Sequence, residues 1–342
     1  MIDNVFILGA GASAEAGAPL MSNFLDKAED LLRSYSFNDN NKIQNLFDVI
    51  HDLNEISAKA SIDLNNIESI LGALEMKEII SNGNKELTNL KESYIQMLAE
   101  TIELSMNYKF NRERKLQPHQ SIDNFFKAIS KIKNTSAIIT FNYDLAIDVA
   151  LTSQKIEYSY NLVDNTDLGI PLLKLHGSLN WHKTDNEDIG YYGIEALIHD
   201  FRSKYFNDEL TEKIEFKVIT SPIPEKQKYI PFIIPPTWNK TMYHKSISSV
   251  WQKAASCLNE ARNIFVLGYS LPESDSFFRY LYALGTQGPS RIRRFWVFNP
   301  DKLGTKERFK KLLGTQTIER FQYLQMKFSE AAEYLDENLE SF

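Results

Sequence analysis

Residues 4–13 read NVFILGAGAS, a short apolar run that passes directly into a glycine-rich turn. Such a run is typical of a parallel strand covered by helices on both faces. Gly9 and Gly11 open a helical pattern that contains Ser13, and glycines at this place let the backbone approach a phosphate group. A plain tight turn between strand and helix explains them equally well. A dehydrogenase fingerprint is disfavoured, because Gly17 comes too late to be its third glycine.

Four further apolar runs of this kind follow along the chain, at 137–141, 172–175, 264–268 and 295–298. Helical patterns separate them, and this alternation predicts parallel strands joined by crossover helices. The segment 306–342 predicts a helix, a short strand and an amphipathic helix. We therefore expect an α/β fold, a Rossmann-like doubly wound parallel sheet, with residues 1–342 forming a single domain.

Two long segments interrupt this alternation. Between the first two strands, residues 20–132 keep apolar residues at helical spacing, for example at Ile43, Leu46 and Ile50, and predict a large helical insertion. It could support the core, or it could serve as a lid or an oligomer surface. Residues 184–230 form an irregular excursion without a firm period, and the pattern assigns no structure to them.

Composition excludes several classes of function. The chain has 342 residues, a formal net charge of −7 and a pI near 5.5, so direct nucleic-acid binding is not expected. Cys257 is the single cysteine; it can form neither an internal disulfide nor a zinc module with four thiolates, and no metal site is expected. Because the N-terminus lacks a positive leader and no apolar run reaches the ~18 residues of a membrane helix, we expect a cytoplasmic protein without membrane contact.

Polar residues follow the second and third strands. Asn142 and Asp144 lie in TFNYD, residues 140–144, at a predicted carboxyl end, where open α/β sheets place their ligands. An amide there can donate to and accept from a ribose hydroxyl or a water molecule, although helix capping alone also explains both residues. His176 follows the next strand in KLHGS. It could act as a general base or be a structural histidine.

The last two strands also end in small or polar residues. Gly268 and Ser270 stand in VLGYSLP, which suits a ribose or a phosphate. Asn299, in Asn299-Pro300-Asp301, could bind an adenosine ribose, and an Asn-Pro turn explains it equally well.

Together and in this order, these segments resemble the sirtuin family of NAD-dependent enzymes. The family pattern runs Gly-Ala-Gly-x-Ser, Gly-x-Pro, Asn-x-Asp, His-Gly and Gly-x-Ser, and it covers the core but not the helical insertion. The resemblance implies catalytic roles for Asn142 and His176. It implies that the other contacts to NAD come from eight residues: Gly9, Ala10, Gly11 and Ser13 at the pyrophosphate, Asp144 at the nicotinamide riboside, Gly268 and Ser270 at the ribose-phosphate, and Asn299 at the adenosine end.

The chain departs from the protein deacylases of this family at three places. It cannot form their zinc module. Leu20-Met21-Ser22 replaces their Asp-Phe-Arg loop, and the proline-containing IIPPTW at 233–238 replaces the strand that pairs with an acyl-lysine peptide. Peptide deacylation is therefore disfavoured. These sequence motifs are similar to those of zinc-free bacterial sirtuin-like proteins of antiviral defence. Those proteins destroy NAD to halt an infected cell, a response called abortive infection.

The resemblance thus predicts an NAD glycohydrolase that cleaves the nicotinamide-ribose bond to give nicotinamide and ADP-ribose, with NAD as substrate and no metal. Control would come from a homo-oligomer or from a partner such as a HerA-type ATPase or another sensor protein. Two alternatives stay open: an NAD-dependent protein deacylase or ADP-ribosyltransferase, and a non-catalytic scaffold module that senses NAD or ADP-ribose.

Overall fold

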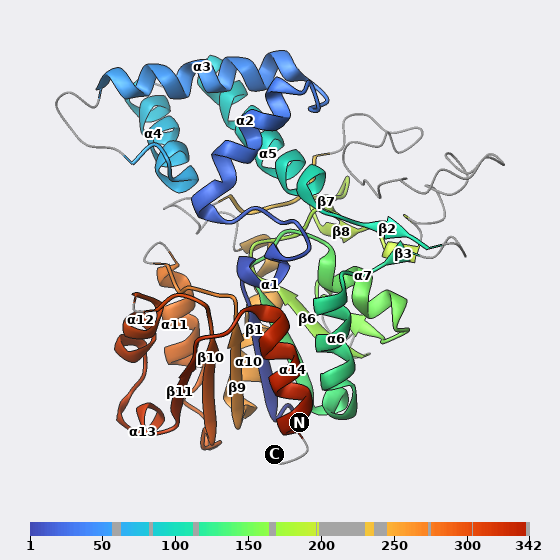
Figure 1. The fold of residues 1–342 in the computed structure, drawn as a ribbon. Coiled ribbons are helices and arrows are strands. Elements are labelled where there is room, and N and C mark those ends of the chain that lie inside the picture. Colours follow the sequence, from blue (N-terminus) through green and yellow to red (C-terminus); the bar gives the residue numbers. More distant parts are fainter. Residues whose placement is uncertain are drawn as a thin grey trace.

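A seven-stranded parallel sheet forms the centre of the computed structural model (Figure 1). The structure describes residues 1–56, 63–81, 85–111, 116–163, 169–195, 197, 230–235, 245–272, 275–302 and 304–339. Within them the strand order is β11 (Phe321–Leu324), β10 (Arg294–Phe298), β9 (Asn263–Leu267), β1 (Asn4–Leu8), β4 (Ser136–Thr140), β6 (Ile170–Lys174) and β5 (Tyr158–Ser159). The predicted Rossmann-like sheet is confirmed.

The register of the sheet brings the strand ends to one level. Leu8 pairs with Thr140 on one side and with Leu267 on the other, and Thr140 pairs in turn with Lys174. Strand order reverses between β1 and β9, and the crevice outside the carboxyl ends at such a reversal is where open sheets bind ligands. The loops after β1, β4, β6 and β9 therefore all begin at the edge where a ligand is expected.

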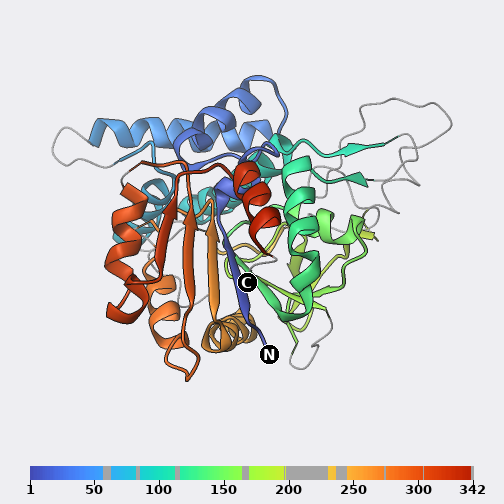
Figure 2. The same ribbon diagram turned by 60° about the horizontal axis from the view of Figure 1, so that its bottom comes forward.

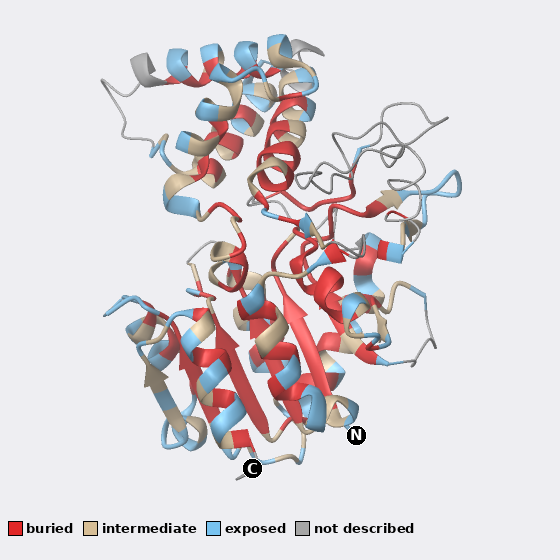
Figure 3. Cartoon of the chain, turned by 45° about the vertical axis from the view of Figure 1, so that its right-hand side comes forward, coloured by how far each residue is buried: buried red, intermediate tan, exposed pale blue. Residues whose placement is uncertain are grey.

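Helices cover both faces of the sheet. On one face, α6 (Gln120–Ile129) packs against α14 (Phe328–Asn338), and on the other α10 (Ser248–Glu260) packs against α11 (Ser276–Gly285) (Figure 2). The five central strands between these layers are almost wholly buried, and the edge strands β11 and β5 are half-buried (Figure 3). The short helices α1 (Ala10–Ala14), α7 (Ala146–Ser153), α12 (Gly304–Leu312) and α13 (Thr315–Ile318) complete the sheet domain.

Aromatic packing holds the centre of the sheet to its helices. Phe6 of β1 stacks on Phe265 of β9 at a ring-centroid distance of 5.1 Å, and it meets the edge of Phe125 of α6 at 5.4 Å. All three side chains are fully buried. Burying a side chain of this kind contributes roughly 1.5–3 kcal/mol to the stability of the fold. The packing of these rings therefore stabilises the strands from which the loops at the carboxyl edge begin.

The insertion, in its described part, is helical and lies over the carboxyl edge of the sheet (Figure 1). Its described helices are α2 (Phe24–Arg33), α3 (Asn40–Ile56), α4 (Ile67–Ile80) and α5 (Lys85–Ser105). The other three pack on α5, and the buried hydroxyl of Tyr94 on α5 donates to the carbonyl of Ile67 on α4 at 2.6 Å. By contrast α6, which also falls within 20–132, belongs to the sheet layer.

Two small hairpins lie beside this edge. They pair β2 (Lys109–Phe110) with β3 (Leu116–Gln117) and β7 (Trp181–Lys183) with β8 (Ile189–Tyr191). The excursion expected at 184–230 begins with β8, but residue 196 and residues 198–229 lie outside the described part of the chain. Among the described helices, none has the length and apolar character needed to cross a bilayer.

Candidate functional site

The glycine turn after β1 packs directly on the turn after β9. The amide of Gly9 donates to Leu267 O at 3.1 Å, and that of Gly11 donates to Gly268 O at 2.9 Å. A Cβ on Gly11 would lie 2.8 Å from the Cα of Gly268, which itself has φ +64°. Close packing of two turns is thus one reason for these glycines, as the tight-turn interpretation expected. The Gly11 amide, and that of Ala12, which donates to Gly9 O at 2.9 Å, are bonded within the protein.

Asn142, in the loop after β4, reaches across to this glycine turn. Its Nδ2 donates to Gly9 O at 3.0 Å and to Ser13 Oγ at 3.1 Å, and the residue is 6% exposed. Because a carbonyl only accepts hydrogen bonds, Gly9 O fixes which end of the amide faces it. The opposite end, Oδ1, accepts no hydrogen bond from any described residue. The Nδ2 end is thus used within the protein, and the Oδ1 end is the one that remains available as an acceptor.

Ser13 links Asn142 to Asp144. Ser13 is fully buried, and its hydroxyl contacts both Asn142 Nδ2 and the Asp144 carboxylate. Asp144 Oδ1 also accepts from the amide of Ala146 at 2.9 Å, the local capping that sequence reasoning left open. Burial raises the pKa of Asp144, and the charge of Lys174 partly opposes this. Ser13 and Asp144, which the resemblance assigns to NAD, are thus both buried and contact one another.

His176 follows β6, the next strand of the sheet, and is 8% exposed. Its Nε2 lies 3.8 Å from Asp275 Oδ1, within ion-pair distance but too far for a direct hydrogen bond. Asp275 Oδ2 accepts from the hydroxyl of Tyr269 at 2.9 Å. Sequence reasoning missed Asp275, which stands directly before α11 and looks like an ordinary helix cap.

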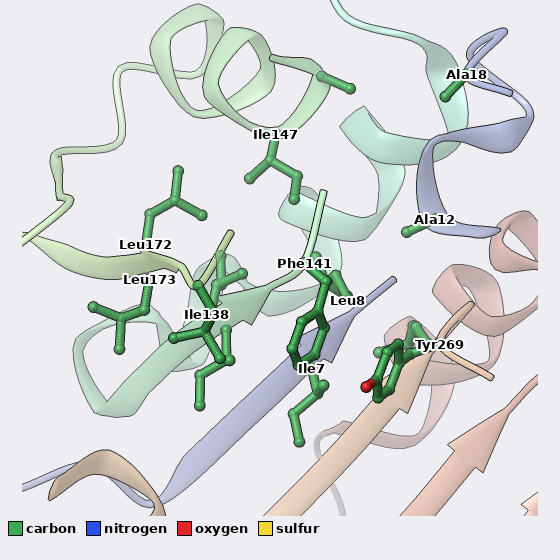
Figure 4. Packing of buried hydrophobic residues seen from close by; sticks show 14 of the residues in the cluster. Ile7, Leu8, Ala12, Ala18, Ile138, Phe141, Ile147, Leu172, Leu173 and Tyr269 are labelled. Atoms are coloured by element: carbon green, nitrogen blue, oxygen red, sulfur yellow. The ribbon is translucent and has the colours of Figure 1, made fainter. Parts of the chain in front are cut away.

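Aromatic rings join the loops after β4, β6 and β9. Phe141 stacks on Tyr269 with ring centroids 4.4 Å apart and planes at 10°, as the close view shows (Figure 4). The edge of the His176 ring meets Phe141 at 5.2 Å. Asn142 and His176 therefore follow neighbouring strands at the same edge, on loops connected through Phe141.

A carboxylate of the helical insertion contributes to the electrostatics of this edge. The Tyr143 hydroxyl donates to Ile234 O at 2.7 Å, and burial raises its pKa, with further increases from the charges of Asp275 and Glu68. Glu68 likewise adds to the raised pKa of Tyr269, after burial and Asp275. Glu68 is in the first turn of α4, so the insertion brings a carboxylate into the electrostatic field of the site. Sequence reasoning missed it.

Ser270 and Asn299 lie on the other side of the strand reversal, after β9 and β10. Ser270 is exposed, and its carbonyl accepts from Arg308 Nε at 2.8 Å. Asn299 is buried, and its Oδ1 accepts from the amide of Asp301 at 2.9 Å, the local turn that was the alternative explanation. Within the described residues, neither side chain is hydrogen-bonded to the Asn142 or His176 loops. The two sides of the strand reversal meet instead through the glycine turns and through the stacking of Phe141 on Tyr269.

Metal ligands do not cluster in the part of the chain that the structure describes: no group of three or more His, Cys, Asp or Glu side chains there could hold an ion. The chemistry that the described residues offer at this edge is that of an amide oxygen, an imidazole and a carboxylate beside the imidazole. Such groups suit proton transfer and the orientation of hydroxyl groups.

No protein-family model matches the sequence, and no curated protein matches it. Solved structures resemble the fold. Sir2Tm bound to a propionylated peptide is 13% identical with a TM-score of 0.43, over 99% of this chain and 93% of that chain. A Sir2 homologue in complex with ADP-ribose is 16% identical with a TM-score of 0.44, over 99% and 92%. Sir2 with a p53 peptide and NAD+ is 13% identical with a TM-score of 0.43, over 99% and 94%.

Proposed function

We propose that this chain is an NAD glycohydrolase, which hydrolyses the bond between nicotinamide and ribose. The observation that carries the proposal is the Oδ1 of Asn142, to which no described residue donates, on a loop joined through Phe141 to the loop of His176. An acceptor and an imidazole at the carboxyl edge of adjacent parallel strands are suited to hold a sugar hydroxyl or a water molecule and to remove its proton.

In the proposed reaction, the bond between the nicotinamide nitrogen and the anomeric carbon of ribose breaks, and its electron pair neutralises the positively charged nicotinamide. The oxygen of water bonds to the same carbon. Asn142 Oδ1 orients a ribose hydroxyl or this water, and His176 accepts the proton that is lost. The leaving group is already activated by its charge, so the chemistry requires no metal, and positioning supplies most of the acceleration.

The remaining predicted residues have supporting parts in this proposal. Ser13 and Asp144 position Asn142 from within the protein. The glycine turn, Gly9 to Gly11 with Gly268, brings its backbone to the carboxyl edge, where the proposal places the pyrophosphate. On the far side of the strand reversal, the proposal places the ribose-phosphate near Ser270 and the adenosine ribose near Asn299.

Replacing Asp275 by asparagine is expected to lower kcat about 10- to 100-fold with little change in KM. The substitution removes the negative charge that stabilises His176 once it is protonated, while an amide oxygen can still accept from Tyr269. Steady-state kinetics with NAD measure this. Tyr269→Phe keeps the charge and the ring stacking, and a smaller loss is expected from it. Full kcat in Asp275→Asn would exclude Asp275 from the mechanism.

We further propose that the enzyme depletes NAD in antiphage defence and that assembly controls it, because uncontrolled hydrolysis of NAD would harm the cell that makes it. The helical insertion lies over the carboxyl edge and brings Glu68 into the field of the site, so contacts made by the insertion could reach the loops. A second copy of the chain or a sensor protein such as a HerA-type ATPase is the proposed partner. A purified monomer with full activity would contradict this.

Product analysis tests the function. The purified chain is incubated with NAD, alone and with its natural partner and trigger, and the products are separated by chromatography. We expect nicotinamide and ADP-ribose in equal amounts without an added peptide. A requirement for an acylated peptide would indicate a deacylase, and labelling of a protein would indicate a transferase. Binding of NAD without any turnover would favour the sensing module.

A further inference from the structure

A lysine is buried between the two loops that carry Asn142 and His176. Lys174, the last residue of β6, is 0% exposed. Its ammonium group donates to the carbonyl of Asp144 at 2.8 Å, to Oδ2 of Asp148 at 2.8 Å and to Oγ of Ser178 at 2.7 Å. An ammonium has three hydrogens, so each is used once: on the loop after β4, on α7 and on the loop after β6.

The partner of the lysine is buried just as fully. Asp148 of α7 is 0% exposed, and its second oxygen accepts a hydrogen bond from the hydroxyl of Tyr160. That hydroxyl accepts in turn from Nδ2 of Asn180 at 3.0 Å. Asn180 stands four residues after His176. The hydrogen-bond network therefore contacts the His176 loop at two points, Ser178 and Asn180.

Stability alone gives no reason for a charge pair at this place. Taking two charges out of water opposes folding, and apolar residues of similar volume are often as stabilising as a buried ion pair. What distinguishes this pair is its position in the chain. Asp144 lies two residues after Asn142, and Ser178 lies two residues after His176, so the ammonium holds both loops at matching points.

We propose that Lys174 and Asp148 form a positioning pair that fixes the Asn142 and His176 loops relative to one another. The expected effect on turnover rests on the proposed NAD hydrolysis. The structural coupling of the two loops does not depend on that proposal. Neither residue touches substrate. Both act through Asn142 and His176, whose separation must match the ribose and the water between them.

The test replaces the pair with apolar residues of similar size, Lys174→Met with Asp148→Leu. The matched control is Asn4→Leu with Asn263→Leu at the opposite end of the sheet. It removes the buried hydrogen bond of 2.9 Å between these two side chains, together with their bonds to Thr135 and Arg294. We expect kcat for NAD to fall about 100-fold in the first variant, with KM within about threefold. Neither should change by more than about threefold in the control.

Hydrogen exchange gives a second readout that is independent of turnover. The amide of Leu179 donates to Tyr143 O at 3.0 Å and so bridges the two loops. Its exchange should become about tenfold faster in Lys174→Met/Asp148→Leu and stay unchanged in the control. Unchanged exchange in the folded variant would overturn the inference. If the wild type does not hydrolyse NAD, the proposed function fails, and exchange still decides whether the pair couples the loops.

If the double variant does not fold, Ser178→Ala takes its place. It removes one acceptor of the lysine, together with the 3.4 Å contact from Ser178 Oγ to Tyr143 O, and leaves the ion pair intact. Slower turnover together with faster exchange at Leu179 is expected, and wild-type values for both would overturn the inference.

Discussion

Replacing Asn142 by alanine is expected to lower the turnover of NAD by about a thousandfold while leaving most of the binding affinity. The substitution removes Oδ1, an acceptor at the carboxyl edge to which no described residue donates. If that oxygen orients a hydroxyl or water at the reacting carbon, its loss acts on the transition state more than on the bound substrate. Single-turnover kinetics and calorimetric titration with NAD measure the two effects separately.

The control for this variant is Ser13→Ala. Ser13 is fully buried and contacts Asn142 Nδ2, so the substitution removes one support of the amide and leaves its bond to Gly9 O and its oxygen in place. A loss of about tenfold or less is expected. Equal activity of Asn142→Ala and wild type would favour the non-catalytic module. Equal losses in both variants would mean that Asn142 acts only by holding the turn.

Replacing Gly268 by alanine is expected to destabilise the fold by about 3 kcal/mol. Its φ of +64° is strained for a residue with a side chain, and a Cβ would lie 2.4 Å from the backbone nitrogen of Ala12 and 2.5 Å from the carbonyl carbon of Gly11. Strain of this kind adds roughly 1–3 kcal/mol, and overpacking adds a similar amount. Since domains are stable by only about 5–15 kcal/mol, denaturant unfolding will detect the change.

Gly193→Ala is the matched control, because a Cβ there meets nothing within 4 Å. We expect its unfolding midpoint to stay close to that of the wild type. A midpoint in Gly268→Ala as high as in this control would mean that the two turns can move apart, and that the tight packing after β1 and β9 does not fix the carboxyl edge.

The central strands could be predicted because each is a nearly unbroken apolar run. The prediction was least accurate at strand ends: β4 begins at Ser136 and β6 ends at Lys174, polar residues that are nevertheless buried. β5 has two residues, Tyr158 and Ser159, which is too short to show a period. Helical spacing identified the insertion, but an apolar stripe does not say which surface covers it, so the pattern could not place α6 with the sheet.

The candidate site could be predicted in part from the rule that open α/β sheets bind ligands at the carboxyl ends of their strands. That rule identified Asn142 and His176, but it carries no information on side-chain partners. Asp275 was missed because it lies near His176 only in the folded chain, and an Asp before a helix already has a local explanation. Lys174 was missed because a lysine in a strand is ordinarily exposed. The hydrogen bond from Asn142 Nδ2 to Gly9 O could not be predicted either, because the two residues come together only in the folded chain.

A crystal structure of the Asn142→Ala variant with NAD tests the central claim most directly, since slow turnover would preserve the substrate. We expect the nicotinamide ribose at the carboxyl edge of β4 and β6, with a ribose hydroxyl or a water within about 3 Å of the His176 imidazole, and the emptied volume at position 142 facing the same sugar. NAD bound away from that edge, or with its nicotinamide ribose on the β9 and β10 side and His176 out of reach, would contradict the proposal that these two residues act on one bond.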